Sequence, residues 1–194
     1  MKYEQDRSRT IESPSNIHIS NSDRLRIDLI VQKDLEDVRL LHNHPAVISF
    51  LTDVRPVNEI EQKEWYLRIS SSRKSYRFVA REKLSSSIVG VFRIDKLDHL
   101  NQSAQIGLDV HPDFQNRGFG TEIYKIFFNT LFNNWNLNRL YLETLASNTR
   151  ARKLYAKLGM KEEGQAREAI FRDGKYNHLI LYSLLRSEFV NDHE

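Results

Sequence analysis

Two glycines one residue apart, Gly118 and Gly120, separate a strand-like run from a helix-like run in the stretch VHPDFQNRGFGTEIY. A helix that begins here directs unpaired backbone N–H groups and the positive end of its dipole toward one point, which favours an anion. Glycine can adopt positive φ and lets a phosphate approach the backbone with no Cβ in the way. Arg117 adds a charge and Thr121 a hydroxyl. The stretch therefore predicts a phosphate site, and an ordinary glycine-rich turn is the alternative.

Two common nucleotide-binding patterns do not match this stretch. A Walker loop has four residues between its glycines and then Lys with Ser or Thr, whereas Gly120 is followed by Thr121, Glu122 and Ile123. A dinucleotide-binding fingerprint requires a third glycine three positions after the second, and that position is Ile123. Both patterns are excluded by spacing.

A second stretch, NTRARKLYAKLGM at residues 148–160, has the pattern of a well-terminated helix. Asn148 is a good N-cap, and Gly159 is a good residue to end the helix. Tyr155 shares a face with Ala151 and Leu158, so the residues alone favour a core tyrosine whose hydroxyl is satisfied.

Gln115-x-x-Gly118-x-Gly120, with the second stretch about thirty residues later, resembles the paired motifs of the GCN5-related N-acetyltransferases. The element order of residues 24–185 is similar to that superfamily as well. The resemblance implies an N-acetyltransferase that uses acetyl coenzyme A as cosubstrate and holds its pyrophosphate on the loop amides. The cofactor-binding residues that it implies are Val110, His111, Gln115, Asn116, Arg117, Gly118, Phe119, Gly120, Thr121 and Asn148.

The resemblance also implies catalytic roles. Tyr155 would give its proton to the departing thiolate. Because the phenol pKa of ~10 lies above the thiol pKa of ~8.5, Tyr155 can stabilise the thiolate by hydrogen bonding and lose its proton fully only late in the step. Val110 and His111 would contact the pantetheine arm and polarise the thioester carbonyl through their backbone.

The proton acceptor is harder to assign. A primary amine is mostly protonated at neutral pH, so a base must act before it attacks the thioester. Relatives often have Glu where this chain has Gln105, and an amide cannot take up that proton. Asp109, which shares a strand face with Gln105, is the nearest remaining carboxylate, and Glu143 is the second choice. A solvated acid at a strand end is the alternative reading of Asp109.

The resemblance is nearest to the spermidine acetyltransferases and the ribosomal-protein N-terminal acetyltransferases, on the stretches HNHPAVISFL, EQKEW and FRDGKYNHLILYSLL. It implies direct transfer to a small amine in a ternary complex, with no acyl-enzyme. A protein N-terminus is an alternative acceptor, and a non-catalytic acyl-CoA sensor is an alternative function. Acidic residues within 32–69 could attract a cationic acceptor, although a solvated helix face explains them equally well.

These motifs must be positioned by an α/β (α+β) fold with a mixed, mostly antiparallel central sheet flanked by helices. Alternation and turn signals predict strands at 24–30, 76–82, 87–95, 103–110, 139–146, 167–171 and 177–185, the last two joined at Asp173-Gly174. Helical spacing predicts helices at 32–51, broken near Pro45, and at 58–69, 120–135 and 148–159.

Composition limits the other possibilities. With 194 residues, 40% of them hydrophobic, the chain can bury one core, which we place at residues 21–194 as a single acetyltransferase domain after a flexible polar arm at 1–20. The net charge of +3 is spread along the chain, so we expect no nucleic-acid binding. The seven histidines are scattered and there is no cysteine, so we expect no metal.

Without a long apolar run or a signal pattern we expect a cytoplasmic protein and no membrane association. Edge strands that need cover are consistent with a homodimer.

Overall fold

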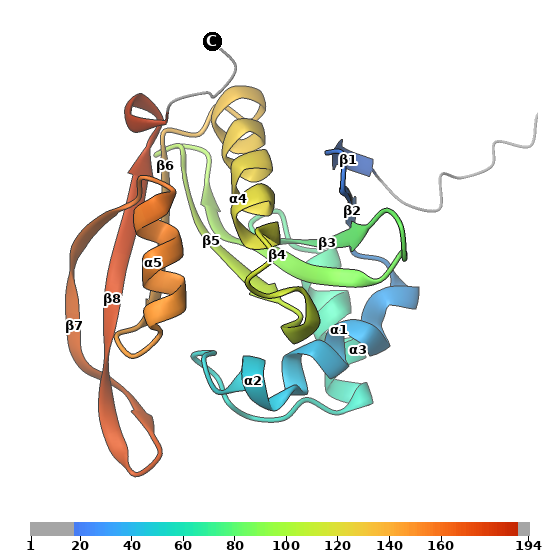
Figure 1. Cartoon of the computed structure of the whole chain (residues 1–194), viewed down its shortest axis with the longest axis horizontal. Coiled ribbons are helices and arrows are strands. Elements are labelled where there is room, and N and C mark those ends of the chain that lie inside the picture. Colours follow the sequence, from blue (N-terminus) through green and yellow to red (C-terminus); the bar gives the residue numbers. More distant parts are fainter. Residues whose placement is uncertain (1–17, 190–194) are drawn as a thin grey trace, which may run out of the picture.

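The computed structural model describes residues 18–189, and in that range eight strands form one sheet (Figure 1). The strands are β1 (His18–Asn21), β2 (Leu25–Leu29), β3 (Tyr76–Glu82), β4 (Ile88–Asp98), β5 (Ser103–Val110), β6 (Arg139–Leu145), β7 (Lys161–Arg172) and β8 (Lys175–Leu185). Their order is β1-β2-β3-β4-β5-β6-β8-β7. Neighbouring strands are antiparallel except for β5 and β6, which are parallel. The expected mixed, mostly antiparallel sheet flanked by helices is confirmed.

The helices follow local signals in the sequence. They are α1 (Leu35–Asn43), α2 (Pro45–Ile48), α3 (Glu59–Ser70), α4 (Phe119–Asn129) and α5 (Thr149–Lys157). The expected break near Pro45 occurs at His44, which is extended and caps α2. Asn58 and Asn148 accept hydrogen bonds from the first-turn amides of α3 and α5, as N-cap side chains do. The expected helix at 120–135 is α4 followed by a π-helical turn at Thr130–Asn134.

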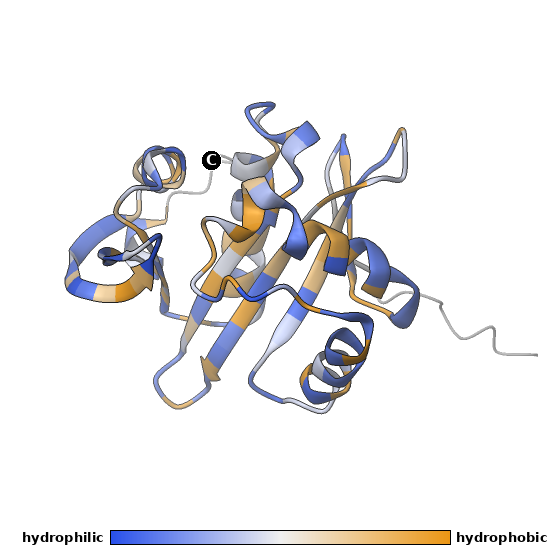
Figure 2. Ribbon diagram, turned by 90° about the horizontal axis from the view of Figure 1, so that it is seen from below, coloured by the Kyte–Doolittle hydropathy of each residue, from blue (hydrophilic) through white to orange (hydrophobic). Residues whose placement is uncertain are grey.

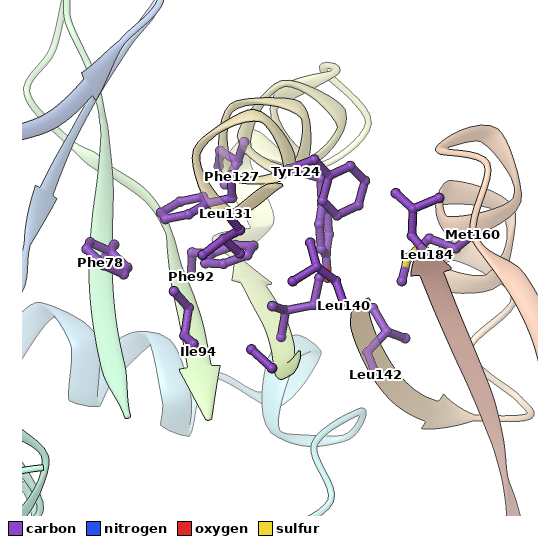
Figure 3. Packing of buried hydrophobic residues seen from close by; sticks show 14 of the residues in the cluster. Phe78, Phe92, Ile94, Tyr124, Phe127, Leu131, Leu140, Leu142, Met160 and Leu184 are labelled. Atoms are coloured by element: carbon purple, nitrogen blue, oxygen red, sulfur yellow. The ribbon is translucent and has the colours of Figure 1, made fainter. Parts of the chain in front are cut away.

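Helices cover both faces of the sheet, and alternate strand residues contribute to the two layers. On one face α4 packs onto β3, β4 and β6; the rings of Phe92 and Phe127 are stacked with centroids 3.7 Å apart (Figure 3). On the other face α1, α2 and α3 pack around Val79 and Val91. Phe78 belongs to the first layer and its neighbour Val79 to the second, so the sheet is buried on both sides where β3 and β4 lie.

The sheet is interrupted where β5 and β6 part. Their parallel pairing runs from Ser103 with Arg139 to Gln105 with Tyr141, and beyond these residues the two strands are no longer registered with each other. Because β5 continues to Val110 and β6 to Leu145, the carboxyl ends of both strands face an opening in the sheet. That opening positions the site described below.

Two strands differ from expectation. β7 begins at Lys161, six residues before the expected start at 167, and nearly all of its residues are exposed on both faces. An exposed edge strand has no apolar alternation, so the sequence carries no period-two signal for its first half. In Figure 2 the side of the molecule on which β7 lies is mainly hydrophilic. Residues 18–20, expected in the polar arm, pair with β2 as part of β1, and residues 1–17 lie outside the described residues.

Within residues 18–189 no helix is long and apolar enough to cross a membrane.

Candidate active site

A cleft of about 590 Å³ lies where β5 and β6 part. Its wall is formed by the ends of those strands, the loop before α4, the first turn of α4, one side of α5, and α2 with the residues after it. Among the residues singled out from the sequence, it is lined by Asp109, Val110, Gln115, Asn116, Gly118, Gly120, Thr121, Asn148 and Tyr155. Three other predicted cofactor-binding residues, His111, Arg117 and Phe119, do not line it.

The glycine loop ends as the N-terminus of α4. Gly118 has φ of 85° and is the N-cap, a conformation that favours glycine. The first intrahelical bond runs from the Glu122 amide to the Gly118 carbonyl at 3.1 Å, so the amides of residues 119–121 precede the hydrogen-bonded turns. The positive end of the helix dipole therefore faces the cleft, as an anion site requires.

Gly120 has a different reason to be small. It lies inside the first turn of α4 without positive φ, and a Cβ there would be 3.4 Å from Leu154 and 3.9 Å from Val110, which are ordinary packing distances. The protein itself therefore has room for alanine at this position. What glycine adds is a bare backbone on the wall of the cleft.

Gln115 connects three parts of the site. Its amide nitrogen donates to the carbonyl of Val110 at 2.9 Å, and its amide oxygen accepts from the guanidinium of Arg150. The end of β5, the glycine loop and the start of α5 are thereby linked through one side chain. Gln115 therefore holds the loop in place and also lines the cleft.

Arg117 does not direct its charge into the cleft. Its guanidinium contacts Glu82 at 3.2 Å and lies over the rings of Phe114 and Phe119, at 5.1 and 5.2 Å from their centroids. Phe119 is 1% exposed and belongs to the core. Both residues therefore shape the back of the loop, and the fixed charge expected from Arg117 is directed away from the cleft.

The two residues at the end of β5 differ in what their backbone can do. The amide of His111 donates to the carbonyl of Val89 at 2.8 Å and is used within the sheet. Because backbone groups alternate in direction along a strand, the amide of Val110 points to the other side, toward the opening between β5 and β6. The His111 ring packs near His44 and Phe114, and His111 itself does not line the cleft.

Arg24, which the sequence analysis did not single out, holds the loop from behind. Its Nε donates to the carboxylate of Glu122 at 2.9 Å, and its Nη1 donates to the carbonyl of Arg117 at 3.2 Å. The same guanidinium lies 4.3 Å from the ring centroid of Phe119. An arginine just before β2 therefore fixes the N-terminus of α4, almost a hundred residues later in the chain.

Tyr155 is placed on the wall of the cleft by α5 and is 8% exposed. Its ring lies between those of Tyr124 and Tyr182, with centroids 5.9 and 5.4 Å away. Burial raises the pKa of the Tyr155 phenol above its ordinary value, although a contact with the Tyr124 hydroxyl acts in the opposite direction. The phenol is therefore protonated at neutral pH, as a proton donor must be.

Asp109 occurs as half of an ion pair. Nη1 of Arg93, on β4, donates to Oδ2 of Asp109 at 2.6 Å. Room for the arginine is made by Gly107, because a Cβ there would lie 2.5 Å from Nε of Arg93. The sequence analysis missed both Arg93 and the reason for Gly107; a glycine inside a strand was the available signal, since it marks close approach of another group.

The Arg93–Asp109 pair separates two cavities. Both residues line the first cleft, and both also line a second cavity of about 500 Å³ on the α1 and α3 face of the sheet. Gln105, four residues earlier on β5, lines neither cavity, whereas Glu143 lines the first. Among the carboxylates considered from the sequence, Asp109 is the one that lines both cavities.

Three further cations, all on α5, line the cleft: Arg150, Lys153 and Lys157. Their spacing of three and four residues puts them along one side of the helix. Asn148 caps the same helix, with Oδ1 accepting from the Ala151 amide at 3.1 Å. The positive charge expected from Arg117 is thus supplied by α5.

Comparison with known proteins gives one family and consistent relatives. The model of the acetyltransferase (GNAT) domain matches residues 24–161. A spermidine N(1)-acetyltransferase of Vibrio cholerae is 24% identical over 171 residues, which are 88% of this chain and 98% of that protein. A putative ribosomal N-acetyltransferase of Bacillus subtilis is 29% identical over 106 residues, 55% of this chain and 58% of that protein. Among solved structures, the V. cholerae spermidine N-acetyltransferase in complex with CoA and spermine has a TM-score of 0.82 at 23% identity, covering 88% of this chain and 100% of that one.

Proposed function

The chain belongs to the GNAT acetyltransferase family and is an N-acetyltransferase, and from this premise we propose that it transfers the acetyl group of acetyl coenzyme A directly to a small primary amine. One observation carries the proposal. Tyr155 and Asp109, a protonated phenol and a carboxylate, line the same cleft, into which the N-terminus of α4 also points. The first two groups can move protons, and the third can bind a phosphate.

The cleft fits the anionic part of the donor. The amides of the first turn of α4 and the bare backbone at Gly118 and Gly120 are suited to a diphosphate. Lys153 and Lys157 add positive charge along the same wall. We propose that these groups hold the diphosphate and neighbouring phosphate of acetyl coenzyme A, with Gln115 and Asn148 keeping the loop and α5 in place.

At the reacting end, one group of this chain moves a proton and another stabilises negative charge. We propose that Tyr155 gives its proton to the thiolate as the carbon–sulfur bond breaks, because burial keeps the phenol protonated. The amide of Val110, which points toward the opening, is available to the oxygen that becomes negative in the tetrahedral intermediate. No acyl-enzyme is needed, because attack of the amine on the thioester forms the amide bond in one addition and one elimination.

On the acceptor side we propose that Asp109 draws the ammonium group toward the thioester and accepts its proton. Asp109 is the carboxylate that lines both cavities, so an amine in the second cavity can reach it from the face opposite to the coenzyme. Its contact with Arg93 holds the carboxylate in one orientation. Glu143, which is exposed at the first cleft, is the competing base.

The second cavity supports a small acceptor. Trp65 contributes an aromatic wall, and the charged lining is balanced, with Arg55, Arg68, Arg77 and Arg93 against Asp53, Glu61, Glu64 and Asp109. The similar V. cholerae and Escherichia coli proteins are spermidine N(1)-acetyltransferases, which favours a polyamine or a related amine for this chain. The similarity to a putative ribosomal N-acetyltransferase makes a protein N-terminus the second candidate acceptor.

The test is turnover with a defined panel of acceptors. The purified chain is mixed with acetyl coenzyme A and, separately, spermidine, spermine, monoamines, amino sugars and a peptide with a free N-terminus. Release of free thiol is followed by absorbance, and the acetylated product is identified by mass spectrometry. We expect rapid thiol release with at least one small amine. Release only with the peptide would favour the second candidate, and binding of the donor without release from any acceptor would favour a non-catalytic sensor.

We also propose that the protein is a homodimer. β7 presents a long exposed edge of the sheet, and exposed edges are commonly covered in assemblies. Light scattering of the full chain at two concentrations tests this, because a mass near twice that of one 22.9 kDa chain is expected.

A further inference from the structure

A second tyrosine lies beside the proposed acid and has no role in the mechanism above. Tyr124, in α4, is 1% exposed and lines the cleft. Its ring meets that of Tyr155 edge to face, with centroids 5.9 Å apart and an interplanar angle of 87°. Phe92 and Phe128 pack against the same ring, and Figure 3 shows Tyr124 on the helix near Phe127, among the core residues. The Tyr124 ring is thus held on several sides.

The hydroxyl of Tyr124 is the unusual part of this residue. It is buried and has no hydrogen-bond partner of ordinary length and angle among residues 18–189. A buried polar group without a partner is unfavourable, and phenylalanine would fill the same space without that group. The Tyr124 hydroxyl therefore does not stabilise the folded protein, which suggests a role during the reaction. Its neighbour Tyr155 is the group whose charge changes in the proposed reaction.

The electrostatics of the pair give the direction of the interaction. Burial raises the pKa of Tyr124 well above its ordinary value, and the nearby Tyr155 raises it further. For Tyr155, burial also raises the pKa, but the contact with the Tyr124 hydroxyl lowers it. Both directions are those expected when the Tyr124 hydroxyl donates and the Tyr155 oxygen accepts. A contact that is loose while Tyr155 is neutral tightens when its oxygen becomes negative.

We propose that Tyr124 is a positioning residue that donates a hydrogen bond to the oxygen of Tyr155 while Tyr155 protonates the departing thiolate. The inference rests on the proposed function. When the carbon–sulfur bond breaks, its electron pair goes to sulfur, the proton of Tyr155 moves to sulfur, and the negative charge is left on the Tyr155 oxygen. Tyr124 stabilises that charge. The proton that the amine nitrogen loses on amide formation then returns to Tyr155 through water.

The variant that tests this is Tyr124→Phe, measured with the best acceptor of the panel. We expect kcat to fall about 10- to 100-fold, the usual effect of losing a hydrogen bond to a charged group, with KM for both substrates unchanged. We expect the melting temperature to stay the same or rise, because the variant removes an unpartnered buried hydroxyl. A tyrosine needed only for packing would show no loss of kcat in this variant, because phenylalanine keeps the same ring in the same place.

Tyr182→Phe is the matched control. The Tyr182 ring also contacts Tyr155, with centroids 5.4 Å apart, but its hydroxyl is engaged elsewhere. It donates to Glu162 at 3.0 Å and accepts from Arg152 at 3.3 Å. Removing it should change kcat by less than about 3-fold, as for a substitution outside the reaction.

A double-mutant cycle completes the test. Because Tyr124 acts through Tyr155, Tyr124→Phe should have no further effect on kcat in a Tyr155→Phe background. An equal loss in both backgrounds, or an unchanged kcat in the wild-type background, would overturn the inference while leaving the transferase assignment intact. Tyr155→Phe at the wild-type rate would overturn it together with the acid assignment. Failure of the proposed function itself is recognised separately, as no thiol release with any acceptor.

Discussion

Arg93 and Asp109 form a hydrogen-bonded ion pair of 2.6 Å across neighbouring strands, and both residues line two separate cavities. The pair joins the proposed donor side to the proposed acceptor side. It depends on Gly107, which leaves space for the guanidinium over β5. The catalytic carboxylate proposed from the sequence is thus not an isolated acid but a member of a packed pair, and this leads to the first two predictions.

Gly107→Ala should disturb the site without touching a reacting group. The new Cβ would lie 2.5 Å from Nε and 2.7 Å from Nη2 of Arg93, so the guanidinium must move away from Asp109. We expect lower kcat and a loss of no more than about 1 kcal/mol in the free energy of unfolding, because the atoms that must move belong to the end of a flexible side chain. Kinetics and denaturant unfolding measure the two effects. A variant with wild-type values of both would show that the position of Arg93 is unimportant.

Asp109→Asn and Glu143→Gln distinguish the two candidate bases. If Asp109 takes the ammonium proton, Asp109→Asn should lower kcat/KM for the amine by about 10²-fold or more, while Glu143→Gln has little effect. The affinity for coenzyme A, measured by calorimetry, should be unchanged in both, because neither group faces the phosphates. A loss confined to Glu143→Gln would transfer the role of base to β6.

Tyr155→Phe should retain the affinity for acetyl coenzyme A and lose about 10²-fold in kcat, by the usual contribution of a positioned acid. Burial raises the pKa of Tyr155, so the protonated form persists below the ordinary phenol pKa and is lost only as pH rises past the higher value. We therefore expect no fall in kcat due to this group between pH 7 and about 10. A falling limb near neutral pH that disappears in Tyr155→Phe would contradict this sign.

Arg24→Ala should weaken binding of acetyl coenzyme A more than it changes kcat. The residue holds Glu122 and the carbonyl of Arg117, so its loss should loosen the N-terminus of α4 where the phosphates are proposed to bind. Calorimetry with coenzyme A measures the change in Kd. Arg139→Ala is the control, since it removes another arginine–carboxylate pair, with Glu163, at the opposite end of β5. Equal effects of the two variants would mean that Arg24 has no specific role in the loop.

Lys153→Ala and Lys157→Ala should each raise the Kd of acetyl coenzyme A about 2- to 5-fold at low ionic strength, as exposed charges do. The effect should shrink with added salt, because such contacts are screened. Comparison with acetyl dephospho-coenzyme A identifies the phosphate involved: a lysine that contacts the missing phosphate should no longer matter for that donor. The same loss with both donors would assign the lysine to the diphosphate.

Local signals made much of the molecule predictable. Gly118 and Asn148 act on their own helix ends, and the break before Pro45 depends on adjacent residues, so each could be inferred from a few neighbouring letters. Strands that bury one face could be predicted from their alternation of apolar and polar residues. The first half of β7 did not, because nearly all its side chains are exposed and nothing in their order distinguishes the two faces.

What the sequence determined by itself is the order of elements, the glycine turn at the start of α4 and the capped helix that carries Tyr155. The tertiary structure decided which groups face the cleft. Arg117 forms an ion pair with Glu82 instead, Lys153 and Lys157 line the cleft, and the Arg93 guanidinium lies over Gly107. The physical reason is one of range. Helix caps, turns and strand alternation depend on residues a few positions apart. The partners of an arginine side chain can be far away in the sequence, and only the folded structure brings them within contact.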